Sequence, residues 1–173
     1  DVLGAYVLFI GMCMALLGFM DAGVFTFLYP AMIAAHANNN AAEFRKKYHQ
    51  LAWKTVALTA LFSACAWLAA MPLLQWLDKP LYLERIDLFA WLLLSTGLFV
   101  VGMIPHYGLY ARGQDKALIV AHIAGFLVFL ASTAALAPIA GELAVPFGLI
   151  SAFAFMLAWK TFQFYRLTPA NWR

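Results

Sequence analysis

The chain has 173 residues, of which 65% are hydrophobic, 16% aromatic and only 11% charged, with a mean hydropathy of +0.83. A soluble domain carries about 25% charged residues and has too little interior to hide this much apolar surface. The composition therefore excludes a soluble fold and predicts an all-α, polytopic membrane protein. The net charge of +3 is concentrated in a few loops and does not indicate a nucleic-acid partner.

Five apolar stretches are long enough to cross a bilayer, which takes about 20 helical residues. The first helix is expected to tilt and to continue past Pro30 into the membrane interface. Because five is an odd number of spans and the chain opens on Asp1, we expect a piece of a longer protein. The predicted spans cover residues 2–30, 54–77, 88–111, 117–136 and 145–164.

The first span carries two features that need an explanation. Gly4, Gly11 and Gly18 recur every seven residues and predict a face on which another helix packs closely. Asp21 interrupts the span, and a carboxylate facing lipid costs on the order of 3 kcal/mol. Asp21 is therefore expected to face protein or water, either as a structural hydrogen-bond partner or as a site for protons, cations or a substrate head group.

The longest polar interruption follows the first span. Three asparagines at 38–40 predict a turn, and the segment 36–54 is predicted to lie on the membrane surface as an amphipathic helix. Its basic patch is expected to contact anionic lipid or, alternatively, an anionic group of a substrate. The patch consists of Arg45, Lys46, Lys47 and Lys54, opposed only by Glu43.

The distribution of lysine and arginine predicts the orientation of the chain. Placing the 36–54 loop, the 112–116 loop and the C-terminal tail in the cytoplasm puts nine basic residues there. Only Lys79 and Arg85 remain on the other side. The N-terminal end is therefore predicted to lie outside and the C-terminus inside.

Three further residues are candidates for a site within the membrane. Pro105 is expected to bend the third span, and His106 directly after it is either a packing residue or one that faces protons or substrate. Arg112 lies in the next short loop. Lys160, near the end of the fifth span, is expected to extend its ammonium group to the interface. With Asp21, these residues form the candidate lumen set.

The sequence lacks the motifs of a membrane enzyme. It has no HExxH, no CxxC and no phosphate-binding glycine-rich loop, and its four histidines are dispersed. Cys13 and Cys65 lie in apolar runs and are expected to be small packing residues. We therefore expect no catalytic residue, no metal site, no cofactor and no ATP-driven step in this chain.

Several short motifs occur in an order that resembles a known family. The chain is similar to the C-terminal part of polysaccharide-biosynthesis proteins, the O-antigen flippase branch of the multidrug/oligosaccharidyl-lipid/polysaccharide exporter superfamily. The resemblance covers most of the chain and rests on order and spacing. The motifs are Leu3-Gly4-Ala5-Tyr6, Tyr29-Pro30-Ala31, the run from Glu43 to Lys47, and Gly-Leu-Tyr-Ala-Arg-Gly at 108–113.

The resemblance implies a specific function and partner. Such proteins move an undecaprenyl-diphosphate-linked oligosaccharide across the inner membrane by alternating access between two six-helix bundles. The five spans would be helices eight to twelve of a twelve-helix chain, with a periplasmic N-terminal end, a cytoplasmic C-terminus and a missing N-terminal bundle as partner. A cationic cavity would attract the diphosphate or anionic sugars.

Two other functions remain open. A cation-coupled drug exporter of the same superfamily would use acidic cavity residues, for which only Asp21 qualifies. A membrane scaffold that does not transport would have no water-accessible site within the membrane.

Overall fold

In the part of the chain that the computed structural model describes, residues 2–78 and 80–173, every regular element is a helix. The predicted class, an all-α bundle of membrane-length helices, is confirmed. The elements are α1 (Val2–Met20), a π-helical turn (Asp21–Phe25), α2 (Thr26–Ala37), α3 (Ala41–Trp76), α4 (Pro80–Glu84), α5 (Ile86–Val101), α6 (Met103–Tyr110), α7 (Asp115–Ala140) and α8 (Ala144–Leu167), with short 3₁₀ turns at Gly141–Leu143 and Ala170–Trp172.

Four stretches are long and apolar enough to cross a membrane, which indicates a membrane protein. The first, Val2–Ala37, joins α1 to α2 through the π-helical turn and continues through Pro30, as the sequence predicts. The second is α3, and the third joins α5 to α6. The fourth, Asp115–Leu167, folds back at Gly141 and so supplies two antiparallel helices, α7 and α8.

α3 is one helix of 36 residues, about 54 Å long at a rise of about 1.5 Å per residue. Asn40 caps it, since the Asn40 Oδ1 accepts a hydrogen bond from the backbone N–H of Glu43 at 3.0 Å. The predicted amphipathic segment over 36–54 is not an element of its own, because α3 begins at Ala41 and passes through the basic patch into the apolar stretch. No glycine or proline lies between Ala41 and Met71, so nothing breaks the helix there.

The third stretch contains the predicted irregularity, but three residues earlier than expected. The break falls at Gly102, between α5 and α6. Pro105 then lies in the first turn of α6, where a missing N–H leaves no helical hydrogen bond unmade.

α7 and α8 form a hairpin that is closed by a turn at Gly141, whose φ of 54° favours glycine. Pro138 lies in the last turn of α7 and Pro146 in the first turn of α8. Both helices are longer than the spans predicted at 117–136 and 145–164. The first turn of α8 tolerates Pro146, whereas Pro138 removes a helical hydrogen bond only in the final turn of α7.

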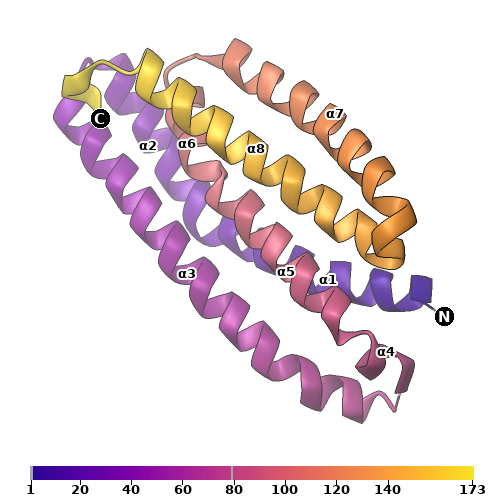
Figure 1. Cartoon of the computed structure of the whole chain (residues 1–173). Helices are drawn as coiled ribbons and strands as arrows, with labels where there is room; N and C mark the ends of the chain where they lie inside the picture. Colours follow the sequence, from indigo (N-terminus) through magenta and orange to yellow (C-terminus); the bar gives the residue numbers. More distant parts are fainter. Residues whose placement is uncertain (1, 79) are drawn as a thin grey trace.

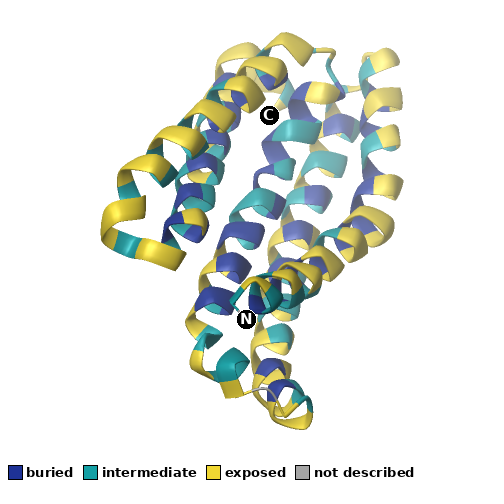
Figure 2. Cartoon of the chain, turned by 90° about the vertical axis from the view of Figure 1, so that its right-hand side faces the viewer, coloured by how far each residue is buried: buried dark blue, intermediate teal, exposed yellow. Residues whose placement is uncertain are grey.

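α8 lies inside the bundle, against α7, α5 and α6 (Figure 1). Two glycines permit the close approach of α7. A Cβ on Gly148 would lie 2.0 Å from Thr133 Oγ1, and one on Gly125 would lie 2.6 Å from Met156 Sδ. Buried residues line the inner faces of the helices, whereas the outer faces are exposed (Figure 2).

Two glycines of the predicted small-residue face of α1, Gly11 and Gly18, do not pack closely against another helix in the described chain. A Cβ on Gly11 or Gly18 would meet nothing within 4 Å, and both glycines are exposed. The prediction of a close helix contact there is therefore wrong within this chain. α1 instead packs through larger residues of its opposite face, such as Phe9 against Phe89 with ring centroids 5.4 Å apart. Of the two cysteines, Cys13 is buried as expected and Cys65 is exposed on α3.

The bundle has two chemically different ends. We call the basic end the one that holds the α2–α3 turn, the α6–α7 turn and the C-terminus (Figure 1). Trp172 joins the C-terminus to α2 and α3, since its ring lies 5.1 Å from that of His36 and 5.5 Å from that of Phe44. At the opposite end, Arg85 pairs with Glu142 at 3.3 Å. The hydroxyl of Tyr6 also donates a hydrogen bond to the backbone carbonyl of Glu142.

Candidate functional site

The π-helical turn at Asp21–Phe25 is the first element of the site. A π-helical turn places an extra residue in the helix and often marks a functional position. The Asp21 carbonyl accepts the backbone N–H of Thr26 and also its hydroxyl, the latter at 2.8 Å, so Thr26 holds the turn together with two hydrogen bonds. The Asp21 side chain is exposed and forms no ion pair with any described residue. Its carboxylate is thus free to bind a ligand.

A polar cavity of about 310 Å³ lies between this turn and α6. Through Asp21 and Tyr107 it adjoins a second cavity of about 460 Å³, which is walled mainly by apolar residues of α1 and α5. The bundle therefore offers a polar chamber that opens along an apolar groove. The polar chamber is lined by Asp21, Thr26, Tyr29, His106, Tyr107 and Tyr110.

Three tyrosines and a histidine form an aromatic wall on this chamber. Tyr29 stacks on Tyr107 with ring centroids 5.2 Å apart, and its edge meets Tyr110 at 6.2 Å. His106 stacks on Tyr110 at 6.4 Å. Flat rings with polar tips suit a ligand that has both apolar faces and hydroxyl groups.

His106 of the aromatic wall also belongs to a cluster of nitrogen groups from three helices. We call it the Lys160 cluster, and it consists of His106, His122 and Lys160. The two imidazole rings are 5.8 Å apart, and the Nδ1 of His106 is buried without a hydrogen-bond partner. Lys160 lies near both rings. The three residues lie within about two turns of the helix ends at the basic end.

Lys160 is only 1% exposed, so its expected reach to the interface is wrong. The side chain stays inside because α8 packs against α6 and α7 on the side of Lys160. It forms no ion pair or hydrogen bond within residues 2–78 and 80–173. Burial of an ammonium group without a partner costs several kcal/mol as an order of magnitude, so this position favours an anion.

Arg112 has a different role from the other predicted site residues. Its guanidinium donates hydrogen bonds to the Thr168 hydroxyl and to the Leu167 carbonyl, the latter at 2.9 Å. Burial lowers the pKa of Arg112, but a guanidinium keeps its charge at neutral pH. Arg112 therefore ties the end of α8 to the α6–α7 turn and does not line the chamber.

The predicted basic patch forms a surface on the first half of α3. Arg45, Lys46 and Lys54 are exposed, and Lys47 pairs with Glu43 at 3.4 Å across one helical turn. The patch lies near the basic end but does not contribute to the chamber. Whether it contacts lipid or substrate stays a prediction.

The structure thus brings Asp21 and His106 into one chamber and places Lys160 next to it. Sequence reasoning did not assign roles to Tyr29, Tyr107, Tyr110 or His122. A signal was present, because Tyr107 and Tyr110 are three residues apart on one helix. Tyr107 directly precedes the motif at 108–113, and Tyr110 belongs to it. Their contact with Tyr29 depends on tertiary structure. Among the described residues, no group of three or more side chains is arranged to hold a metal ion.

The geometry defines a class, an all-α bundle of membrane-length helices with a polar chamber and a buried cation. No protein-family model, curated protein or solved structure matches the chain.

Proposed function

We propose that this chain is part of an inner-membrane transporter that flips a lipid-linked oligosaccharide of the undecaprenyl-diphosphate type by alternating access. The observation that carries the proposal is the pairing of an aromatic polar chamber with a buried, unpartnered Lys160. A saccharide can stack on Tyr29, Tyr107 or Tyr110 and bond to their hydroxyls. An anionic diphosphate suits the Lys160 cluster.

The apolar groove next to the chamber supports the lipid part of this substrate. It is walled by Met14, Leu17, Phe99 and Met103, which suit a hydrocarbon chain. The amphiphilic substrate would keep its tail on this apolar side and its head group in the polar chamber. The excess of lysine and arginine at the basic end supports a cytoplasmic C-terminus and a periplasmic N-terminal end.

The first test measures transport. Lys160→Met keeps the volume of the side chain but removes its charge, and we expect it to lower the rate of oligosaccharide export at least about tenfold. Arg85→Met is the matched control, since Arg85 lies at the opposite end of the bundle and outside the chamber. Export is read from surface glycan in cells that depend on this protein. Equal export by the Lys160→Met variant and the control would contradict the proposal.

The second candidate function, a cation-coupled drug exporter, is favoured by one observation: the unpaired carboxylate of Asp21 lines the same aromatic chamber. A lipophilic cation could bind there through the carboxylate and the ring faces. Loss of cation efflux in Asp21→Asn, with full efflux in Lys160→Met, would favour the exporter over the flippase.

Water access distinguishes both transporters from a scaffold. Single cysteines at positions 21 and 106, in a background without Cys13 and Cys65, are expected to react with a water-soluble thiol reagent. A cysteine in place of Leu68, which is exposed on the outer face of α3, is the control that should stay unlabelled in lipid. Protection at both 21 and 106 would favour the scaffold.

A further inference from the structure

Another cavity, of about 510 Å³, lies at the basic end, between the start of α7 and the end of α8. It shares no lining residue with the polar chamber. The indole of Trp159 donates a hydrogen bond to the Ala117 carbonyl at 3.2 Å and holds the two helices together beside it. Its polar rim is formed by Gln114, Lys116, Gln163 and Arg166, and Val120 and Leu167 belong to its apolar lining.

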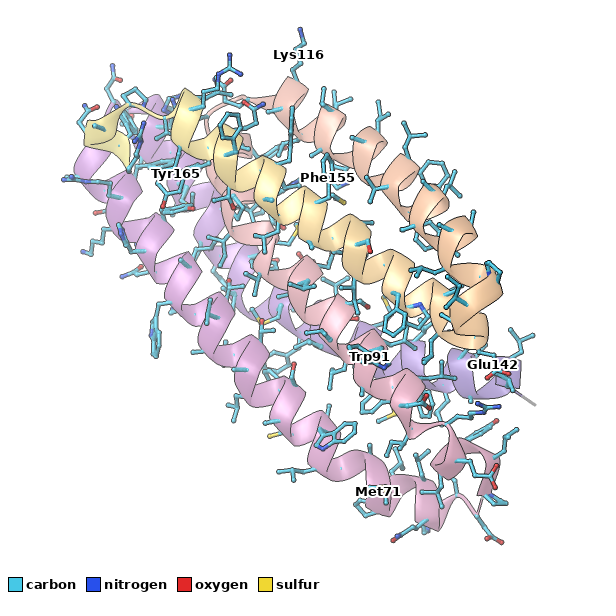
Figure 3. All side chains as sticks on the ribbon, in the orientation of Figure 1. Met71, Trp91, Lys116, Glu142, Phe155 and Tyr165 are labelled. Carbon is cyan, nitrogen blue, oxygen red and sulfur yellow. The ribbon has the colours of Figure 1, made fainter. Side chains whose placement is uncertain are left out.

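The rim carries net positive charge. Lys116 and Arg166 are exposed and form no ion pair with any described residue. Asp115 in the first turn of α7 is the nearest carboxylate along the chain, but it does not line the cavity. Arg112 is engaged with the end of α8. Figure 3 shows Lys116 at the start of α7, where its side chain projects outward.

Two unsatisfied groups make the cavity more than a charged surface. Gln163 is only 8% exposed, yet its amide makes no hydrogen bond within the described chain. The N-terminus of α7 has no side-chain cap. The Ala117 N–H donates to the Gln114 carbonyl at 3.2 Å, and the N–H groups of Asp115 and Lys116 remain without a partner among the described residues. Free amides at the start of a 26-residue helix favour an anion, and they favour phosphate in particular when basic side chains lie beside them.

The surroundings of the cavity point to a lipid. The cavity lies at the ends of two membrane-length helices, which is the level of lipid head groups. From Val120 in its wall, exposed apolar residues continue along α7, among them Ile123 and Leu127. This strip can contact the acyl chains of a lipid whose phosphate lies at the rim.

We propose that this α7–α8 cavity binds the phosphate head group of an anionic phospholipid. Lys116 and Arg166 neutralise the charge, and Gln163 donates a hydrogen bond to a phosphate oxygen. This inference goes beyond the proposed transport function and does not depend on which substrate occupies the polar chamber.

The test measures lipid selectivity of the purified protein. Short-chain phosphatidylglycerol and phosphatidylcholine are titrated in detergent, and bound lipid is counted by native mass spectrometry. We expect the wild-type protein to bind phosphatidylglycerol more tightly than phosphatidylcholine. In the Lys116→Gln/Arg166→Gln variant, the ratio of the two affinities should fall about tenfold. Arg85→Gln is the control, because it removes a charge at the opposite end of the bundle that lines no part of this cavity and should leave the preference unchanged.

Gln163→Leu separates a built site from diffuse surface charge. It keeps all charges and should still weaken phosphatidylglycerol binding several-fold, since only a specific site uses the amide. Loss of selectivity in the Arg85→Gln control to the same degree, or full selectivity in both cavity variants, would overturn the proposal. The proposal would also be overturned if soluble glycerol phosphate displaced bound phosphatidylglycerol as well as phosphatidylglycerol itself does, because the site would then bind free phosphate. A failure of transport in the export assay would leave this result unaffected.

Discussion

α1 and α8 are both apolar helices of membrane length, but they meet very different surroundings. α8 has three helices around it and a charged side chain, Lys160, in its interior. On α1, a Cβ added at Gly11 or Gly18 would meet no described atom within 4 Å. The comparison teaches that a glycine or a charge in a membrane helix has meaning only through its neighbours. At α8 a glycine permits close packing and a charge belongs to the site, whereas the glycines Gly11 and Gly18 of α1 lie on an exposed face.

The largest expected effect tests the glycines of the two regions. A Cβ on Gly108 would lie 2.6 Å from Phe164 and 2.8 Å from Tyr48, two rings that stack 4.5 Å apart. Because neither ring has room to retreat, Gly108→Ala should lower the free energy of unfolding by about 2 kcal/mol. Thermal unfolding in detergent measures it. Gly11→Ala is the control and should change stability by less than about 0.5 kcal/mol; equal losses would remove the contrast.

The second prediction concerns the end of α8. Arg112→Met removes the hydrogen bonds to the Leu167 carbonyl and to the buried Thr168. We expect a loss of about 1.5 kcal/mol, at the lower end for charged hydrogen bonds because Arg112 is partly exposed. Lys46→Met on α3 removes an exposed charge and should have little effect. Protection of α8 amides from hydrogen exchange gives a second measurement, and unchanged protection in Arg112→Met would contradict the assigned role.

The third prediction has the opposite sign. Lys160→Met should raise the stability of the ligand-free protein by about 1 kcal/mol, because it replaces an unpartnered buried ammonium by an apolar group. The same variant should transport more slowly, so misfolding cannot explain the loss. Asp21→Asn on the first helix is exposed and should leave stability nearly unchanged. A clear loss of stability in Lys160→Met would mean that the ammonium has an internal partner.

The smallest effect is expected at the opposite end of the bundle. Arg85 and Glu142 are each 42% exposed, and their 3.3 Å pair joins the start of α5 to the α7–α8 turn. Solvent weakens such a pair, so Arg85→Gln should cost less than about 0.5 kcal/mol. Thermal unfolding at low and high salt measures this contribution. A loss above about 1 kcal/mol would show that this contact, and not α8, holds the hairpin in place.

Much of the helix plan could be predicted, and its errors share one cause. Spans and turns follow from apolar length and from residues such as Gly141 and the three asparagines at 38–40. The amphipathic segment over 36–54 is continuous with the next helix, because amphipathic spacing does not tell where one helix ends and another begins. The site was predicted in part: Asp21 and His106 line one chamber, but the tyrosines were missed and Arg112 has a structural role.

The sequence alone determined the class of this protein, the number of long helices and the concentration of basic residues in a few segments, because hydropathy and length decide which segments can cross a membrane. Only the tertiary structure decided which face of each helix is inside. In a bundle surrounded by lipid both faces are apolar, so α1 can expose 71% of Leu3 and bury Phe9 completely with no change in pattern. For the same reason, the burial of Lys160 and the meeting of Tyr29 with Tyr107 depended on packing between helices that are distant in the sequence.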